Sequence, residues 1–220
     1  MPFPIAVLAS GRGSNLAALI DAKEAGTLPV EIVLVASDKA EAPALRNAEA
    51  HGVPTFALNP KTFATRREFD EALFARVAES GAELVVLAGF MRILDATVVE
   101  QWHGRIINIH PSLLPKYRGL HTHRRAIAAR DAEHGASVHF VTAELDGGPV
   151  IAQARIPLHA EDDEETLAAR LLQQEHRLIV ACVSAIACGR VELRDGVVYC
   201  DGKALREPLR LEENGSLRTA

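Results

Sequence analysis

The chain has 220 residues, enough for one large α/β domain or two small ones, and 48% of them are hydrophobic, which argues against a disordered protein. Its net charge of -5 argues against nucleic-acid binding over a broad surface. The first apolar run has no basic residue before it and is interrupted by Gly11, so it predicts neither a signal peptide nor a membrane span. We therefore expect a soluble, cytoplasmic protein with no nucleic-acid or membrane partner.

The first half of the chain alternates between short apolar runs and helical stretches. Strands are predicted at 5–9, 31–37, 55–58, 83–89 and 105–109, and helices at 14–25, 42–51, 66–80 and 95–102. This alternation is typical of βαβ units, which build a mostly parallel sheet with helices on both faces. The sequence therefore predicts an α/β, doubly wound protein with a single domain over residues 1–206.

The second half of the chain has a looser pattern. A helix is predicted at 121–131, strands at 135–145 and 149–158, and a long helix at 163–188 that begins with Glu164 and Glu165. Residues 190–202 alternate around Asp195-Gly196 and predict a C-terminal antiparallel hairpin. The last residues, 207–220, are expected to form a flexible tail. Leu114-Pro115 is a candidate cis peptide, because two prolines follow a strand closely there.

Gly11 and Gly13 lie between the first predicted strand and the first predicted helix. Glycines let the backbone turn sharply and approach an anion, and the helix start at Ser14 and Asn15 offers unpaired N–H groups. A plain strand-to-helix turn with a capping side chain fits the same residues. A dinucleotide fingerprint would need a third glycine where this chain has leucine, although Asp38 stands where a ribose-binding acid would lie. A single phosphate is the favoured ligand.

Asn108 and His110 close the fifth predicted strand, and alternate residues of a strand project from the same face. An amide that can donate to a developing oxyanion would thus lie beside an imidazole that titrates near neutrality. Asp146 is followed by two glycines and a proline in an irregular loop, and its carboxylate would favour the imidazolium of His110. Taken alone, this aspartate fits a hairpin-turn residue that caps the loop backbone better than it fits a catalytic acid.

The sequence offers neither a protein nucleophile nor a metal site. No serine, cysteine or lysine lies in a nucleophile motif, and the nine histidines lack the spacing of metal ligands. The three cysteines also lack that spacing, and they fit buried or bystander side chains in a reducing compartment. Asn108, His110 and Asp146 therefore predict a metal-free transfer reaction in which a substrate supplies the nucleophile.

Five stretches of the sequence together resemble the glycinamide ribonucleotide formyltransferases, a family of purine biosynthesis: "SGRGSN", "LAGFMRIL", "INIHPSLLPKYRGLHTHRRAI", "GASVHFVTAELDGGPVI" and "QQEHRL". The resemblance covers about residues 5–205. Its histidine and aspartate motifs are shared with other enzymes that use 10-formyltetrahydrofolate, whereas "GRGSN" and "GLHTHRRAI" are typical of this family. It implies a Rossmann-like formyltransferase fold, with a phosphate-binding half over about 1–103 and a folate-binding, catalytic half over about 104–206.

The resemblance also implies what the matching residues do. Asn108, His110 and Asp146 would catalyse direct transfer of the formyl group of 10-formyltetrahydrofolate to the amine of 5-phosphoribosylglycinamide. The ribonucleotide would be held by the phosphate loop and by a turn that closes over it: Gly13, Ser14, Asn15, Leu172, Gln173, Gln174 and Glu175. The folate would contact Asn108, one arginine of a helix and two loops: Arg66, Met91, Arg92, Ile93, Leu94, Thr142, Ala143, Glu144, Leu145 and Asp146.

Three alternative functions stay open. Methionyl-tRNA formyltransferases share the chemistry, but they are expected to carry an additional domain that grips RNA, which this acidic chain is not expected to have. Formyltetrahydrofolate hydrolases are expected to have an added N-terminal regulatory domain, whereas the first predicted strand here begins at Ile5. A non-catalytic module that binds a nucleotide or phosphate would leave the catalytic trio unexplained. The protein is expected to be a monomer or a homodimer.

Overall fold

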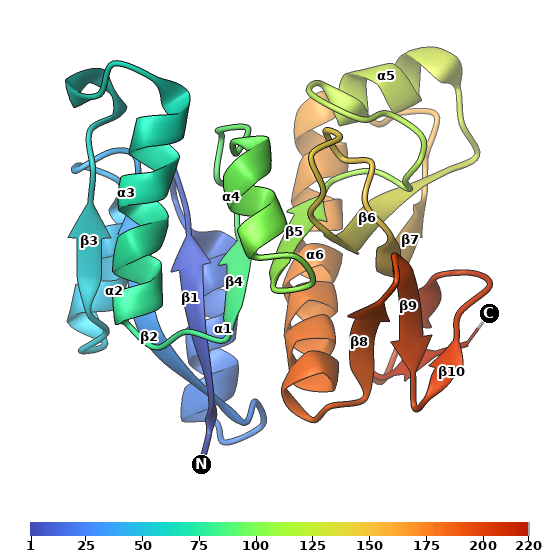
Figure 1. The fold of residues 1–220 in the computed structure, drawn as a ribbon. Coiled ribbons are helices and arrows are strands. Elements are labelled where there is room, and N and C mark those ends of the chain that lie inside the picture. The colour runs from blue at the N-terminus through green and yellow to red at the C-terminus, as the bar shows by residue number, and fades with distance from the viewer. Residues whose placement is uncertain (220) are drawn as a thin grey trace. The chain divides into compact units, whose positions relative to one another are not determined.

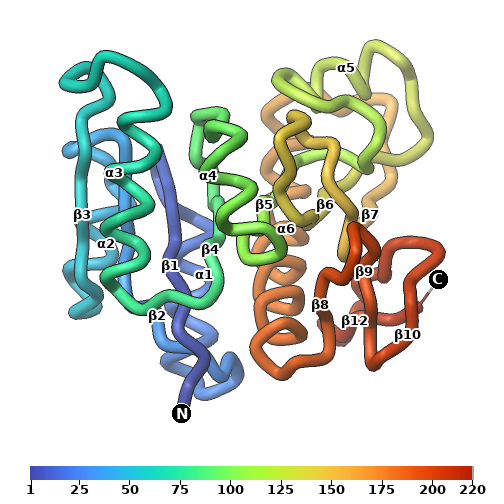
Figure 2. The backbone as a smooth tube through the Cα atoms, viewed as in Figure 1, coloured from blue at the N-terminus to red at the C-terminus, as the bar shows by residue number. Residues whose placement is uncertain are grey.

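The computed structural model describes residues 1–219. The chain folds into two compact units, Met1–Asn108 and the residues from 109 onward (Figures 1 and 2). This boundary lies close to the one predicted between a phosphate-binding half and a catalytic half, at about residue 103. The single domain over 1–206 stays a prediction.

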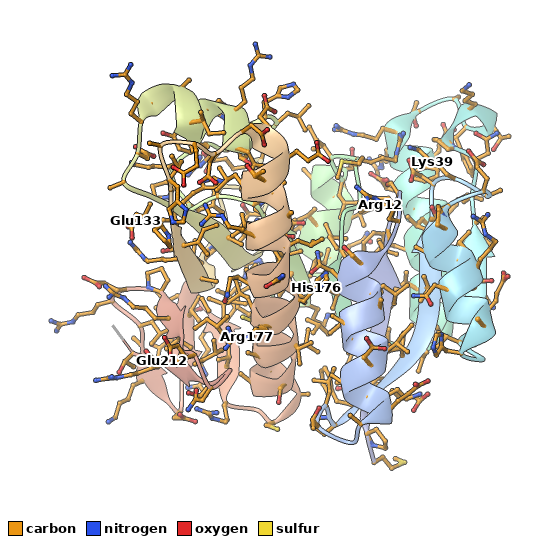
Figure 3. The ribbon with its side chains drawn as sticks, turned by 180° about the vertical axis from the view of Figure 1, so that it is seen from behind. Arg12, Lys39, Glu133, His176, Arg177 and Glu212 are labelled. Atoms are coloured by element: carbon orange, nitrogen blue, oxygen red, sulfur yellow. The ribbon has the colours of Figure 1, made fainter. Side chains whose placement is uncertain are left out.

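The first unit is a parallel sheet with helices on both of its faces. Its strands pair in the order β3-β2-β1-β4-β5, and each of these pairings is parallel. Helices α1 and α2 lie on one face and α3 and α4 on the other (Figures 1 and 3). The elements are β1 (Phe3–Leu8), α1 (Ser14–Glu24), β2 (Val30–Ser37), α2 (Pro43–Ala50), β3 (Thr55–Ala57), the 3₁₀ helix η1 (Pro60–Thr62), α3 (Arg66–Glu79), β4 (Leu84–Leu87), α4 (Ala96–Gln101) and β5 (Ile106–His110), whose last two residues belong to the second unit.

Burial and capping explain these elements. Strand β4 reads LVVL and is buried along its whole length, as expected of a parallel strand covered on both faces. The side chain of Thr65 accepts a hydrogen bond from the N–H of Glu68 at 3.2 Å and starts α3, and Asp95 starts α4 in the same way through Thr97 at 2.9 Å. The doubly wound pattern of strands and helices predicted for this half is confirmed.

The second unit combines an antiparallel strand pair with a long helix. Strands β6 and β7 pair antiparallel, and α6 packs on both of them. Helix α6 begins with a capping box between Asp163 and Thr166, and the predicted Glu164 and Glu165 lie in its first turn. The elements are α5 (Thr122–Ala129), β6 (Glu133–Phe140), β7 (Val150–Pro157), α6 (Glu164–Ala187), β8 (Val191–Arg194), β9 (Val197–Cys200), β10 (Lys203–Ala204), β11 (Leu209–Leu211) and β12 (Leu217–Arg218).

Two local predictions in this unit are confirmed. Strands β8 and β9 form the predicted antiparallel hairpin, whose turn at Asp195 and Gly196 has φ of 49° and 75°. The hairpin gains a third strand, β10, that the sequence analysis did not predict. The Leu114-Pro115 peptide is cis. Of the helices within residues 1–219, not one is long and apolar enough to cross a membrane.

The predicted flexible tail over 207–220 is wrong for residues 209–211 and 217–218. Strand β11 pairs parallel to β7 and antiparallel to β12. Leu209 is only 1% exposed, and Arg177 of α6 donates hydrogen bonds to the carbonyls of Glu212, at 2.9 Å, and Glu213 (Figure 3). The alternation of leucines in "PLRL" carries this strand, and its partner β7 is too distant in sequence for local patterns to reveal.

Replacing Leu209 with alanine tests this packing. The variant should lose about 2–5 kcal/mol of unfolding free energy, because a fully buried leucine is truncated. Urea unfolding followed by circular dichroism would measure the loss. The neighbouring Arg210→Ala removes an exposed side chain and should stay within about 0.5 kcal/mol of the unmodified protein. Equal stability of the two variants would contradict the observed role of β11.

Candidate active site

A hollow of about 310 Å³ lies at the carboxyl ends of β1 and β4 in the first unit. These two strands are neighbours, but the chain continues from β1 toward β2 and from β4 toward β5, in opposite directions. Such a switch point is where open parallel sheets bind ligands. The hollow is lined by Ser10, Gly11, Arg12, Gly13, Ser14, Asn15, Lys39, Ala88, Gly89 and Met91.

Gly13 is required at its position for two physical reasons. Its φ is 74°, a left-handed conformation that L-residues rarely adopt, and a Cβ there would lie 2.6 Å from the Cβ of Ala44. The turn therefore depends on close packing of the loop against α2. Ser14 then begins α1, whose first N–H groups are directed out of the helix end.

The lining of the hollow favours a phosphate over a dinucleotide. Leu16 is buried in the core where the dinucleotide fingerprint needs glycine, and Asp38 is buried and outside the lining. Two cationic side chains, Arg12 and Lys39, border the hollow (Figure 3). Neither takes part in an ion pair within residues 1–219. Their positive charge is therefore directed to whatever binds there.

Strand β5 carries Asn108 and His110, with the alternation that the sequence predicted. His110 is buried, and its Nε2 lies 3.0 Å from the carbonyl oxygen of Tyr117. Its Nδ1 lies 3.5 Å from Oδ2 of Asp146. Both ring nitrogens thus face acceptors, an environment in which the doubly protonated imidazolium can satisfy both.

Asp146 is held by contacts to both of its oxygens. The N–H of Gly119 donates to Oδ2 at 2.8 Å, and Nε2 of His139 lies 3.8 Å from Oδ1. Nδ1 of His139 lies 2.8 Å from the carbonyl oxygen of Phe140, and burial lowers the pKa of this imidazole. A neutral His139 leaves the negative charge of Asp146 directed at His110.

Gly148 is fixed by lack of space next to the backbone, whereas a side chain at Gly147 would displace the side chain of Glu144. A Cβ on Gly148 would lie 1.9 Å from the carbonyl oxygen of Phe140, and one on Gly147 would lie 2.4 Å from the carboxylate of Glu144. Asp146 itself has a φ of 48°, a left-handed conformation that L-residues rarely adopt. These constraints explain the Asp-Gly-Gly sequence without reference to a ligand, while they also aim the carboxylate at His110.

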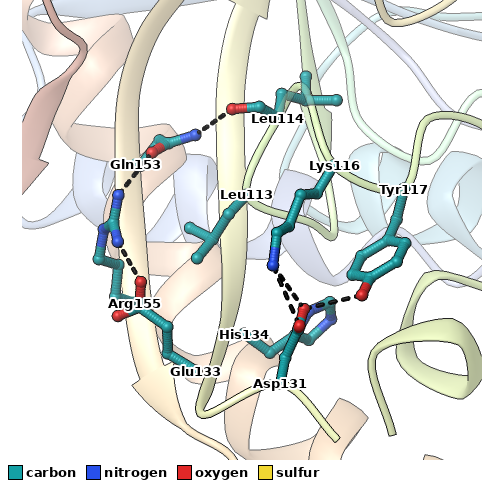
Figure 4. A pocket seen from close by; sticks show the side chains of 9 residues that line it. All are labelled: Leu113, Leu114, Lys116, Tyr117, Asp131, Glu133, His134, Gln153 and Arg155. Atoms are coloured by element: carbon teal, nitrogen blue, oxygen red, sulfur yellow. Dashed lines mark hydrogen bonds and ion pairs between the residues drawn. The ribbon is translucent and has the colours of Figure 1, made fainter. Parts of the chain in front are cut away.

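A second hollow, of about 200 Å³, adjoins the loop that carries the Tyr117 carbonyl (Figure 4). Asp131 accepts hydrogen bonds from the Tyr117 hydroxyl at 2.8 Å and from Lys116 at 3.0 Å, and Arg155 pairs with Glu133. The lining is Leu113, Leu114, Lys116, Tyr117, Asp131, Glu133, His134, Gln153 and Arg155. Burial lowers the pKa of His134 to about 4, so this imidazole is neutral near pH 7. The charged side chains of this hollow pair with one another. The hydrogen bond from Tyr117 to Asp131 anchors the residue whose carbonyl oxygen faces His110.

The remaining predicted residues fall on three segments. Arg66 is the first residue of α3, and residues 91–94 form the loop after β4, where Met91 and Ile93 are 69% and 50% exposed. Residues 142–146 follow β6, with Glu144 paired to Arg118. Residues 172–175 lie inside α6, as the long helix predicted over 163–188 requires, and they form no separate loop.

Several site residues were absent from the sequence-based prediction. Arg12 and Lys39 border the phosphate hollow, and Gly119 and His139 contact Asp146. Gly119 and His139 lie within motifs that carried the family resemblance, but only the fold shows that they contact Asp146. The described residues contain no group of three or more His, Cys, Asp or Glu side chains placed to hold a metal. Cys182 is buried, which raises the pKa of its thiol, while Cys188 is exposed.

Comparison with known proteins shows the family to which this chain belongs. The family described as Formyl transferase matches residues 4–183. The chain belongs to this family. Over 201 residues it is 46% identical to the phosphoribosylglycinamide formyltransferase of Escherichia coli (strain K12). The matched region covers 91% of this chain and 95% of that protein. As a member of the family it is a formyl-transferring enzyme.

Other relatives agree. The solved structure of phosphoribosylglycinamide formyltransferase from Coxiella burnetii, in complex with CHES, has a TM-score of 0.91 and 42% sequence identity, with 100% of both chains covered. The trifunctional purine biosynthetic protein adenosine-3 of Gallus gallus is 42% identical over 89% of this chain, which corresponds to 20% of that protein. The formyltransferase fold predicted from the sequence is confirmed.

The unpaired cation of Lys39 gives a test of the phosphate hollow. Lys39→Ala should weaken binding of a phosphoribosyl ligand by about tenfold, equivalent to about 1.4 kcal/mol, because one of two free charges is lost. Calorimetric titration would measure it. Lys23→Ala is the matched control, since Lys23 lies in the last turn of α1 and pairs with Glu31 at 2.9 Å. Equal affinity of both variants would argue against a phosphate in this hollow.

Proposed function

We propose that this enzyme transfers the formyl group of 10-formyltetrahydrofolate to the amine of 5-phosphoribosylglycinamide, a step of purine biosynthesis. The observation that carries the proposal is the phosphate hollow at the switch point of the first unit, with its free cations Arg12 and Lys39. The names of the relatives state phosphoribosylglycinamide as the formyl acceptor. The Escherichia coli relative is 46% identical over 91% of this chain.

The ribonucleotide is assigned to the hollow of the first unit. Its phosphate would accept hydrogen bonds from the backbone at Gly13, Ser14 and Asn15, where the helix dipole of α1 adds positive potential. Residues 172–175, in particular the carboxylate of Glu175, are assigned to the ribose hydroxyls or the glycinamide amine. In this assignment the substrate amine is the nucleophile, and no side chain of the protein has to attack the formyl group.

The folate is assigned to Arg66 and to the loops 91–94 and 142–146. The exposed Met91 and Ile93 offer apolar surface to a flat aromatic ring system, and the loop backbone offers hydrogen-bonding groups to its edge. Arg66, at the start of α3, would pair with a carboxylate of the glutamate tail. No metal takes part in this reaction scheme.

The chemistry follows from the contacts of His110 and Asp146. The glycinamide nitrogen forms a bond to the formyl carbon, the Asn108 amide donates to the resulting oxyanion, and the positive charge of protonated His110 stabilises it. The bond from this carbon to N10 of the folate then breaks, and the proton of the attacking amine passes through a water held by Asp146 to N10. Losing one oxyanion donor typically costs about 3–4 kcal/mol.

Related functions differ in the acceptor. A methionyl-tRNA formyltransferase would use the same donor with a tRNA, a hydrolase would use water, and a binding module would turn over neither. Cytoplasmic location, a monomeric or homodimeric state and the absence of a nucleic-acid or membrane partner stay predictions from the sequence.

An acceptor comparison tests the proposal directly. Purified protein with 10-formyltetrahydrofolate should release tetrahydrofolate when 5-phosphoribosylglycinamide is added, and should not do so with initiator methionyl-tRNA. Release would be followed by absorbance. Comparable rates with both acceptors would contradict the assignment, and formate produced without any acceptor would favour the hydrolase.

The role of Asp146 predicts a change in pH dependence. Asp146→Asn keeps the shape but removes the charge that favours the imidazolium, so kcat at neutral pH should fall at least about 100-fold. Because the imidazolium of the variant would lose its proton at a lower pH, acidification should restore activity in part. NMR titration of His110 in both proteins would measure this shift. Near-normal turnover of the variant would mean that Asp146 is only a turn residue.

A further inference from the structure

The loop between β4 and α4 is held at both ends by buried polar side chains. At its start, the N–H of Met91 donates to the hydroxyl of Ser10 at 2.9 Å, and at its end the N–H of Asp95 donates to Oδ2 of Asp70 at 2.7 Å. Ser10 and Asp70 are both buried, and Asp70 is 0% exposed. The backbone between them is therefore fixed, while Met91 and Ile93 project outward.

Asp70 is a charged group in an apolar place. It lies on the buried face of α3 together with Phe69, Leu73 and Phe74, and this burial raises the pKa of its carboxyl. Within residues 1–219, its Oδ1 has no hydrogen-bond partner. An asparagine or serine could satisfy the single N–H of Asp95 without burying a charge, so that hydrogen bond alone does not explain an acid at this position.

The charged side chains around Asp70 explain why an acid, and not an amide or a hydroxyl, occupies this position. Arg92 of the loop and Arg66 of α3 act on it as cations and oppose the effect of burial, while Asp95 acts as an anion. The guanidinium of Arg92 lies over the ring of Phe69, 4.7 Å from its centroid, and its buried Nε has no hydrogen-bond partner within the described residues. The positive charges of two arginines thus act on one buried carboxylate, and both arginines belong to the proposed folate site.

We propose that Asp70 is a positioning residue for the formyl donor, whose negative charge holds Arg92 and Arg66 while its hydrogen bond to Asp95 fixes the end of loop 91–95. The donor would meet a preformed loop and two oriented guanidinium groups, so little ordering would be needed on binding. This proposal rests on the proposed function, because it assumes that the loop contacts folate.

Asp70→Asn separates charge from shape, because an asparagine still accepts the Asp95 hydrogen bond. The variant should raise KM for 10-formyltetrahydrofolate about tenfold, with kcat within about threefold of the unmodified enzyme and KM for the ribonucleotide unchanged. Asp70→Ala, which removes both functions, should raise the donor KM further. Circular dichroism and urea unfolding would show which variants are folded.

The pH dependence gives a readout that a merely structural role would not produce. As pH falls and Asp70 takes up a proton, the unmodified enzyme should come to resemble Asp70→Asn, so the ratio of their donor KM values should fall toward one. Protonation of the donor itself cancels in that ratio. Glu71→Gln is the matched control: Glu71 is an exposed acid of the same helix, paired with Arg67 at 2.7 Å, and its loss should leave every constant unchanged.

Calorimetric binding of tetrahydrofolate, measured without any acceptor, separates failure of this inference from failure of the proposed function. If the unmodified protein binds tetrahydrofolate but forms no product from the ribonucleotide, the acceptor assignment fails while Asp70 can still be tested by affinity. Unchanged tetrahydrofolate affinity in a folded Asp70→Asn would overturn the inference. So would a ratio of donor KM values that is independent of pH, or an equal rise in both KM values.

Discussion

The hydrogen bond from Gly119 to Asp146 is the contact on which the arrangement of the second unit depends. It joins two loops that are distant in sequence, one after β5 and one between β6 and β7. The first loop also carries the Tyr117 carbonyl, which binds the far side of the His110 ring. The imidazole is thereby fixed between a carbonyl and a carboxylate, one from each loop.

Side chains that never meet a substrate maintain this geometry. Tyr117 and Lys116 are anchored on Asp131, whose carboxyl pKa is lowered chiefly by the hydrogen bond from the Tyr117 hydroxyl. Gly148 lets the second loop pass close to the carbonyl of Phe140, where a Cβ would lie only 1.9 Å from the carbonyl oxygen. The pairing of His110 with Asp146 thus depends on packing and electrostatics of both loops, and a local motif alone would not produce it.

Most of the secondary structure could be predicted from the sequence, because the apolar runs of the first half are long, buried and separated by capped helices. Asn108, His110 and Asp146 were identified as a set, and the structure brings His110 and Asp146 to 3.5 Å. Asp70 could not be identified, since an acid on a helix is ordinarily read as a solvated side chain. His139 was one of many scattered histidines, and only the strand pairing of β6 with β7 places it against Asp146.

The wrong prediction for the C-terminal residues has its origin in the pairing of strands that lie far apart in the sequence. The tail was expected to be flexible because "EENGS" is polar, yet Leu209 belongs to the core and β11 finds its partner in β7, more than fifty residues earlier in the chain. Residues 172–175 lie within the helix predicted over 163–188, and the continuous apolar face of α6 keeps them helical. Local sequence patterns indicate which residues are buried, but they do not identify the strand or helix against which those residues pack.

The short strands at the C-terminal end of the second unit also determine how the molecule meets its neighbours in solution. Without β11, the full length of β7 would present unpaired backbone groups on one side, a ready template for another chain. With β11 in place, the outermost strand is β12, which has two residues and includes the exposed Arg218. An edge so short and so charged offers little to another chain, so this segment protects the stretch of β7 at Ala152 and Gln153 that it covers.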